Sequence, residues 1–443
     1  MRAWLILGAL WAVSPAFACT IFVTEGQGHV LVGNNEDDAP GQRSYFWFRP
    51  HRSIGYVLWG HDRERPEGGM NDKGLFFDAA ALPESIPIHK TAGRPDLNSY
   101  AVEPVLRQFT TVAQALAYLN RFNLVWQEKA QIFLADASGD AAIVHPNYTI
   151  HERASTNLAL TNHRLDTAKP AACWRRDLAR YLLASSNARD MALVSRTLAA
   201  TAQADLGNST LYSLGADLST GIITFYYDRR FDNAVELNLA NELRKGVRVV
   251  DMSTLVPMSW SDEIAAHGME ATRARLGSLS PDATLELSRT GYELLRRDKA
   301  AEAIEVFRIA NEKLRTAASY SDLANALNFT GRADEARLMY QRALTIDESD
   351  YSANLMGGRN GLVTFRLKAF SFAKRVSVPA SFNGNDAQAL ELRKIGEEWF
   401  GSITLPKGRY FYSFHVDDSW TTDPLNGLSA KPKEYFSSVL VVQ

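Results

Sequence analysis

The pattern of apolar residues changes twice along this chain, and this change constrains its fold more than any single motif does. Short alternating runs typical of β-strands dominate residues 19–250. Helical periodicity dominates residues 260–349, and alternating runs return over residues 362–443. A chain of 443 residues is also too long to fold around one hydrophobic core. The sequence therefore predicts three successive regions: an α+β domain, a helical segment and a small β-sandwich.

Within residues 19–250, the strand candidates are short runs rich in β-branched and aromatic residues. They are residues 20–24, 30–32, 45–48, 56–59, 75–77, 132–135, 142–144, 158–160 and 222–227. Helical periodicity covers residues 112–122, 174–184 and 189–202. Strands with helices between them predict a layered α+β domain of about 230 residues.

Residues 1–18 have the pattern of a cleaved secretory signal peptide. Arg2 precedes an apolar run over residues 3–13, and the small-x-small tripeptide Ala16-Phe17-Ala18 ends the segment. The run is too short to span a bilayer. A buried N-terminal helix and a lipoprotein anchor are the alternatives, although a lipoprotein usually has Leu where this chain has Ala16. Cleavage after Ala18 predicts a periplasmic or secreted protein whose first residue is Cys19.

Composition narrows the classes of partner and the source of stability. The formal net charge is −2 with the two signs interspersed, and without a basic block nucleic acid is not an expected partner. No stretch after residue 18 is apolar enough to predict a membrane span. Only two cysteines are present, Cys19 and Cys173. We expect Cys173 to pack in the core and the two thiols not to form a disulfide.

An N-terminal cysteine combines a nucleophile and a base in one residue. The α-amino group has an unperturbed pKa of about 7.7–8.0, so it is partly neutral at pH 7 and can accept the thiol proton. Cysteine is already a strong nucleophile, so modest activation suffices. The attacked carbonyl then needs an oxyanion hole, which Asn side chains and backbone N–H groups can form. Cys19 is therefore a candidate catalytic nucleophile.

Five motifs in order resemble the N-terminal nucleophile (Ntn) hydrolases. They are CTIFVTEGQGHVLVGNNEDD, GGMNDKGLFFDAAAL, QIFLADASGDAAIVHP, LALTNHR and TLYSLGADLSTGIITFYYDRRFD, and they cover about residues 19–239. Within that group they are similar to the linear-amide carbon–nitrogen hydrolases, which include choloylglycine hydrolase, penicillin V acylase and acid ceramidase-type enzymes. The resemblance implies an αββα four-layer sandwich over residues 19–250. It also implies a small-molecule N-acyl amide substrate, a thioester acyl-enzyme, and neither a cofactor nor a metal.

The resemblance also assigns roles to single residues. It makes Cys19 the nucleophile with its own amine as base, Asp37 the aspartate that orients the N-terminal residue, and Asn162 the oxyanion asparagine. The substrate side of the site would include Asn34, Asn71 and His163.

Several of these positions have a competing interpretation or depart from the family. Asp37 also fits a surface hairpin carboxylate, and Asn162 fits an asparagine in a turn or at a strand end. Asn71 also fits a turn before Gly74, and His163 fits a structural histidine. Many bile-salt and penicillin members have Arg at the position of Asn34, so the substrate is not expected to be a bile salt or penicillin. The candidates to replace that cation are Arg43, Arg49 and Arg164.

The helical segment contains a repeat. Leu287, Gly291, Leu294, Ala303, Phe307 and Ala310 recur as Tyr320, Ala324, Leu327, Ala336, Tyr340 and Ala343, each 33 positions later. A further helix is expected over residues 262–279. The pattern resembles the tetratricopeptide repeat, whose period is about 34 residues. Such repeats imply either a bound protein partner or a spacer, and both remain open.

Residues 362–443 resemble the glycogen-binding module of AMP-activated kinase β-subunits and starch-branching enzymes. The matching residues include Ser381-Phe382-Asn383, Trp399, residues 405–408, Tyr412, Phe414, Trp420 and Asp423-Pro424. Trp420 corresponds to one aromatic platform for sugar. The second platform falls at Asn385 and the family lysine at Ser413, and these two departures argue against carbohydrate binding.

The sequence as a whole predicts a secreted amidohydrolase that cleaves a linear amide through a thioester at Cys19. Transfer of the acyl group to an amine instead of water would make it an acyltransferase. A non-catalytic binding protein on a hydrolase scaffold is the alternative from another class. The Asn at position 34 favours the binding protein, and Cys19 behind a well-formed cleavage site favours the enzyme.

Overall fold

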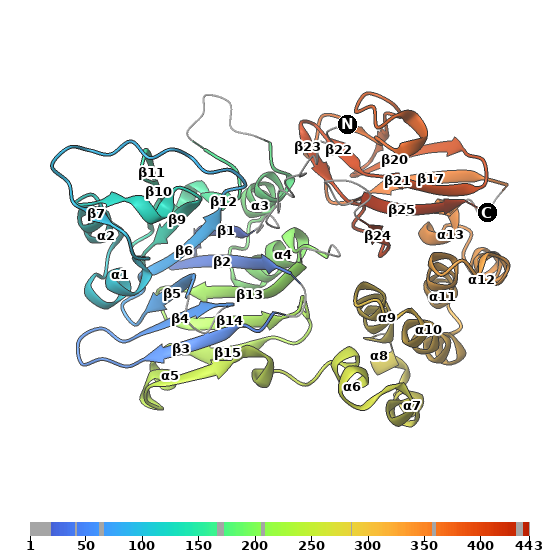
Figure 1. Ribbon diagram of the computed structural model, residues 1–443, viewed down its shortest axis with the longest axis horizontal. Coiled ribbons are helices and arrows are strands. Elements are labelled where there is room, and N and C mark those ends of the chain that lie inside the picture. Colours follow the sequence, from blue (N-terminus) through green and yellow to red (C-terminus); the bar gives the residue numbers. More distant parts are fainter. Residues whose placement is uncertain are drawn as a thin grey trace, which may run out of the picture.

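A computed structural model describes residues 19–39, 42–61, 66–165, 172–204, 209–284, 286–356, 360–430 and 437–442. The expected leader, residues 1–18, lies outside them. The first region lies on the left of Figure 1, and the helical and C-terminal regions lie on the right. Among the described residues, no helix has the length and apolar character that spanning a membrane requires.

Two antiparallel sheets form the centre of the first region. The first sheet has the order β12 (Ala159–Thr161), β1 (Thr20–Gly26), β2 (His29–Asp38), β13 (Ser209–Asp217), β14 (Ile222–Tyr227) and β15 (Val235–Asn238). The second has the order β11 (Tyr148–Arg153), β10 (Asp140–His145), β9 (Ala130–Ala135), β6 (Phe76–Ala81), β5 (Gly68–Asn71), β4 (Tyr56–Gly60), β3 (Tyr45–Arg49) and β16 (Arg248–Asp251).

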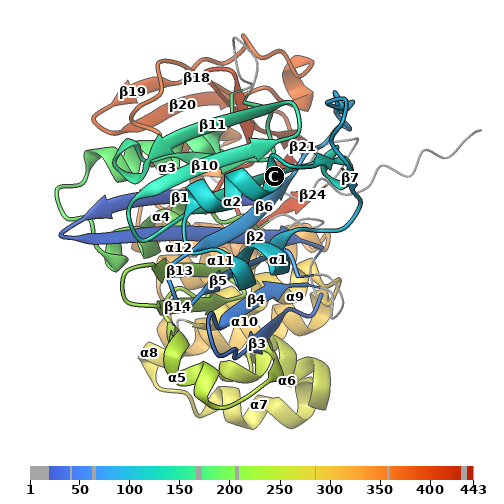
Figure 2. The ribbon, with the colours of Figure 1, turned by 90° about the vertical axis from the view of Figure 1, so that its left-hand side faces the viewer.

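Helices cover the outer faces of both sheets. The core between the sheets includes Ile21, Phe76 and Phe225. On the second sheet, α1 (Val102–Gln108) and α2 (Val112–Leu119) bury a separate core, and Figure 2 shows both helices in front of its strands. On the first sheet, α3 (Trp174–Ser185) and α4 (Met191–Thr201) pack over Phe22. The order is helix, sheet, sheet, helix, which is the layering expected for residues 19–250. Short elements complete the region: β7 (Asp96–Leu97), β8 (Asn123–Leu124) and α5 (Leu239–Arg244).

Every strand candidate of the first region overlaps an observed strand, but β2 continues much further than expected. The predicted run ended at Val32, whereas β2 extends to Asp38 and all of residues 30–38 are buried. A polar run can occupy a central strand because β1 and β13 satisfy its backbone and other side chains satisfy its polar groups. This polar half of β2 contains most of the candidate site.

The helical region consists of α6 (Trp260–His267), α7 (Met269–Gly277), α8 (Pro281–Thr284), α9 (Glu286–Arg296), α10 (Ala300–Leu314), α11 (Ala317–Phe329), α12 (Ala333–Ile346) and α13 (Tyr351–Leu355). The single helix expected over residues 262–279 is two helices, because Gly268 has a φ of 82° between α6 and α7. In the repeat, α9 packs on α10 and α11 on α12. A Cβ at Gly291 would lie 2.3 Å from the Phe307 ring, so this close packing needs glycine.

The C-terminal strands form three short sheets instead of the two of a simple sandwich. Their orders are β17 (Leu362–Leu367), β20 (Glu398–Thr404), β19 (Arg393–Ile395); then β18 (Val376–Ser377), β22 (Phe414–Val416), β23 (Ser419–Thr421); and β21 (Gly408–Tyr412), β25 (Ser437–Val442), β24 (Ser429–Ala430). Their buried residues join those of the helices in one continuous core, which includes Leu327 and Phe365. The helical and C-terminal regions therefore share a core despite their different sequence patterns.

Candidate functional site

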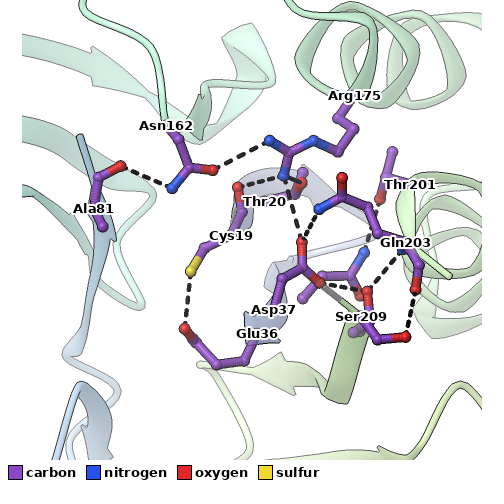
Figure 3. A network of polar contacts seen from close by, with 12 residues as sticks. Cys19, Thr20, Glu36, Asp37, Ala81, Asn162, Arg175, Thr201, Gln203 and Ser209 are labelled. Atoms are coloured by element: carbon purple, nitrogen blue, oxygen red, sulfur yellow. Dashed lines mark hydrogen bonds and ion pairs between the residues drawn. The ribbon is translucent and has the colours of Figure 1, made fainter. Parts of the chain in front are cut away.

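The pairing of β1 with its two neighbours places Cys19 between Glu36 and Asn162. Thr20 pairs with Asn35 of β2 and with Thr161 of β12, so in the next antiparallel position Cys19 faces Glu36 on one side and Asn162 on the other. Residues opposite each other in an antiparallel pair point to the same face. The Cys19 Sγ accordingly donates to Glu36 Oε1 at 2.8 Å (Figure 3). Cys19 is 2% exposed, so the thiol is enclosed by protein.

Alternation along β2 separates its polar side chains into two groups. Asn34 and Glu36 point with the thiol toward the second sheet, where Asn34 Nδ2 donates to Glu36 Oε2 at 3.1 Å and to Asp78 Oδ2 at 2.7 Å. Asp78 Oδ2 also accepts from Trp59 Nε1 at 3.0 Å. Asn34 thus joins two buried carboxyl groups near the thiol.

His61 and Glu67 complete this acidic side of the site. His61 Nε2 lies 3.8 Å from Glu36 Oε1 and 3.5 Å from Glu67 Oε2, and its Nδ1 lies 3.2 Å from Ser44 Oγ. Burial lowers the pKa of His61 to about 4, so the imidazole is neutral at pH 7. The carboxyl groups of Glu36 and Glu67 therefore receive no compensating positive charge from His61.

Burial and mutual repulsion disfavour the ionised forms of the groups on this side of the site. Burial, then Glu67 and Asp78, raise the pKa of Glu36 well above its ordinary value. Burial, then the carboxyl groups of Glu36 and Asp37, raise the pKa of the Cys19 thiol well above its ordinary value. A thiol in this environment is not ionised at neutral pH without an additional positive charge or a base next to it.

The other face of β2 organises the backbone around Cys19 through Arg175 of α3. Arg175 Nη1 donates to Cys19 O at 2.9 Å and to Thr20 Oγ1 at 3.0 Å, and it lies 3.5 Å from Asp37 Oδ2 (Figure 3). Gln203 Nε2 donates to the same Asp37 oxygen at 2.6 Å. Asp37 thus contacts the Cys19 backbone through Arg175, and its charge also raises the pKa of the thiol.

Asn162 is held from both ends. Its Nδ2 donates to Ala81 O at 2.7 Å, and its Oδ1 accepts from Arg175 Nη2 at 3.1 Å (Figure 3). An amide nitrogen carries two N–H groups, so one remains to donate to a substrate oxygen. Because Arg175 bonds both Asn162 and the Cys19 carbonyl, it fixes the position of the amide relative to the nucleophile.

Asn71, predicted from the sequence to lie either on the substrate side of the site or in a turn, has the contacts of a turn residue. Asn71 is buried, its Nδ2 donates to Leu106 O and Phe109 O, and its Oδ1 accepts from the backbone of Lys73 and Leu75. Both ends of its amide are engaged, so Asn71 closes a turn, as its alternative interpretation from the sequence expected.

His163 lies beside Cys173. Cys173 is buried and its thiol is free, as is that of Cys19. Burial raises the pKa of Cys173, but Arg175 and His163 outweigh burial and lower that pKa to about 6. The Cys173 thiol is thus buried in the core and also lies near polar and charged side chains.

The arginine that contacts Asp37 and the Cys19 carbonyl is Arg175, which was not among the candidates from the sequence. Arg43 is largely exposed and lies 3.8 Å from Asp251, and Arg49 donates to the neighbouring Phe48 O. Arg175 instead follows Cys173 at the start of a helix more than 150 positions from Cys19. The sequence feature that could have indicated Arg175 is the amphipathic pattern of α3, because Arg175 lies among the buried residues of this helix together with Leu178 and Ala179.

Asp78 provides a test of the buried acids. Burial raises its pKa to about 7, whereas an unfolded aspartate titrates near about 3.9. Between these values only the folded protein retains the proton, so the free energy of unfolding falls as pH rises from about 4 to 7. We expect the free energy of unfolding of Asp78→Asn, measured with urea, to rise relative to that of wild type as pH rises. The difference should change by on the order of 2 kcal/mol between pH 4 and pH 7. Asp334→Asn, where the carboxyl is 93% exposed, is the surface control measured in parallel. A wild-type slope retained in Asp78→Asn would contradict the assignment.

A cavity of about 1070 Å³ lies where the three regions meet. Trp174 and Gln203 of the first region form part of its wall, and Trp420, Asn385 and Ser413 line its C-terminal side. The positions that correspond to the sugar contacts of the glycogen-binding module are therefore together in space. Only Trp420 among them has an aromatic ring.

We expect the whole protein not to be retained by amylose resin. Stacking of a sugar on Trp420 alone lacks the second ring and the lysine, so the contact area and the hydrogen bonds are both reduced. Affinity electrophoresis in amylose should show equal mobility for wild type and Trp420→Ala. Retardation of wild type that is lost in Trp420→Ala would show that the module binds starch.

No protein-family model matches this chain, and no curated protein matches it. Among solved structures it is similar to two variants of the conjugated bile acid hydrolase from Clostridium perfringens, at 14% and 13% identity with TM-scores of 0.42 and 0.39. Both alignments cover 53% of this chain and 96% of the hydrolase. It is also similar to penicillin V acylase from Agrobacterium tumefaciens, at 18% identity and a TM-score of 0.41, over 53% of this chain and 91% of the acylase. Scores this low do not establish a shared fold, so the assignment of function rests on the residues around Cys19.

Proposed function

We propose that this protein is a secreted or periplasmic amidohydrolase that cleaves a linear N-acyl amide through a thioester on Cys19. The observation that supports it is the position of Cys19 at the edge of β1, between Glu36 and Asn162, with its carbonyl held by Arg175. A nucleophile next to a fixed amide donor is the arrangement that acyl transfer requires.

In the proposed reaction, cleavage after Ala18 exposes the α-amine of Cys19. The amine accepts the thiol proton as sulfur attacks the substrate carbonyl, and Asn162 Nδ2 donates to the oxyanion that develops. The leaving amine takes the proton from the ammonium, which leaves a thioester. A water molecule then attacks the thioester with the same amine as base, releases the carboxylic acid and restores the thiol.

The acidic surroundings of the thiol suit a protein that is silent before export. In the uncleaved chain residue 19 has an amide nitrogen, which is not basic, and the carboxyl groups raise the pKa of the thiol. Cleavage supplies the base that this environment lacks. We therefore propose that removal of the leader is the activating step.

The direct test is a panel of N-acyl amides incubated with purified mature protein. Hydrolysis of any member, with a mass increase of one acyl group on the Cys19 peptide in quenched reactions, would support the proposal. Adding primary amines separates hydrolysis from acyl transfer, because an acyltransferase would form a new amide. Tight binding of a panel member without turnover would favour the non-catalytic binding protein.

Asn162→Ala should lower turnover by about 10²–10³-fold, the range seen when one oxyanion donor is removed. Asn162→Asp is the matched variant of nearly equal size, and it should be equally impaired because a carboxylate repels the oxyanion. Thermal denaturation of both variants checks that they fold. Near-normal turnover in folded Asn162→Ala would remove Asn162 from the site.

A further inference from the structure

His61 has a hydrogen-bonding atom that the described protein leaves unpaired. It follows β4, its side chain is 4% exposed, and its Nε2 has no hydrogen-bond partner. Its other nitrogen, Nδ1, lies 3.2 Å from Ser44 Oγ, which can accept the Nδ1 proton. In that tautomer the Nε2 atom presents a lone pair to the interior, an arrangement typical of a histidine that binds a metal.

Carboxyl oxygens face that lone pair. Glu67 Oε2 lies 3.5 Å, Glu36 Oε1 3.8 Å and Asp38 Oδ2 4.0 Å from His61 Nε2. One ligand atom from each of Glu36, His61 and Glu67 can be chosen so that all three lie within 4.8 Å of one another. Acceptor atoms gathered this closely repel one another unless a proton or a cation lies among them, and a divalent cation would be bound by all three side chains at once.

We propose that Glu36, His61 and Glu67 bind a divalent first-row transition metal, with Zn²⁺ as its test ion. One imidazole and two carboxylates suit such ions better than Mg²⁺, which prefers oxygen ligands in near-ideal octahedral geometry. Three protein ligands leave a position for water or another ligand. The Glu67 side chain is 37% exposed, so the ion can enter from that side.

The proposed metal site takes no part in the proposed reaction, but it shares Glu36 with the contacts of the Cys19 thiol. Glu36 Oε1 accepts from the Cys19 thiol and is also one of the atoms nearest to His61 Nε2. A dication there would offset the negative charge that faces the thiol. The resemblance noted from sequence implies no metal, so this site would be a property of this chain.

The test is isothermal titration calorimetry of untagged mature protein with ZnCl₂ in a Cys19→Ala background. This background is necessary because an N-terminal cysteine can chelate Zn²⁺ with its own amine and thiol. It also makes the result independent of the proposed function, since Cys19→Ala is not expected to turn over any amide. The parent should bind one Zn²⁺ per chain, and equal concentrations of Mg²⁺ should not compete.

In that background, His61→Ala and Glu67→Gln should each weaken Zn²⁺ binding by at least about 10–100-fold, and Ser44→Ala by about 10-fold through loss of the Nδ1 partner. The control is His151→Gln, which removes a surface histidine that lies 2.8 Å from Asp140 and should leave affinity unchanged. Circular dichroism without metal checks folding, and Glu67→Gln keeps the test valid if His61→Ala does not fold. Absence of Zn²⁺ binding in the parent, or equal affinity in the folded ligand variants, would overturn the proposal.

Discussion

A mature chain with two untrimmable residues added before Cys19 should lose turnover by on the order of 10⁴-fold or more. The added peptide bond converts the α-amine into an amide that cannot accept the thiol proton. The thiol would then remain protonated, because burial and the nearby carboxyl groups raise its pKa. Turnover of the best amide substrate, compared between the extended and the correctly processed chain, measures the effect.

Substitutions of the two cysteines separate the nucleophile from a general thiol effect. Cys19→Ala should abolish turnover, and Cys19→Ser should retain little, since a hydroxyl is far less acidic than a thiol. Cys173→Ala is the matched control: its thiol is also buried, contacts His163 and should not be required. Normal hydrolysis by the extended chain would reject the N-terminal nucleophile mechanism, and loss of activity in folded Cys173→Ala would move the nucleophile to the second thiol.

Arg175→Met should have the second largest effect, on both stability and turnover. The guanidinium is 6% exposed and the Asp37 carboxyl 0%, so the substitution leaves a buried carboxylate without its ion-pair partner. Breaking a buried pair in this way costs about 3–5 kcal/mol. Turnover should fall by about 10²-fold or more in the fraction that folds, because Arg175 also holds the Cys19 carbonyl and Asn162.

Its neighbour provides the control. Arg176 is buried on the same helix and lies 3.3 Å from Asp177, so Arg176→Met should cost stability without a comparable loss of turnover per folded molecule. Urea unfolding gives the stabilities, and kcat of folded protein gives the turnover. Asp37→Asn with Arg175→Met should recover part of the lost stability, since both charges are then removed. Equal effects of Arg175→Met and Arg176→Met on kcat would show that Arg175 has only a structural role.

Period-2 alternation and short apolar runs were enough to locate nine strands of the first region, since each of the nine candidates overlaps an observed strand. The repeat with its 33-residue offset likewise predicted α9 to α12, because small and aromatic residues at helical spacing are what close helix packing requires. These are local patterns, and burial on one face of an element imposes them directly on the sequence. The same reasoning failed for the polar half of β2, because its buried residues are polar and form no apolar pattern in the sequence.

The sequence alone predicted that a leader would be cleaved after Ala18, and it singled out the thiol of Cys19, the first residue after that cleavage, as the nucleophile. Only the tertiary structure decided which side chains surround it. The pairing of β1 with β2 places Glu36 beside the thiol and directs Asp37 to the opposite face, toward Arg175. Arg175, Asp78, His61 and Glu67 come from a helix and from strands or loops of the other sheet. Their roles depend on contacts between residues far apart in the chain, and such contacts leave no periodic pattern in one sequence.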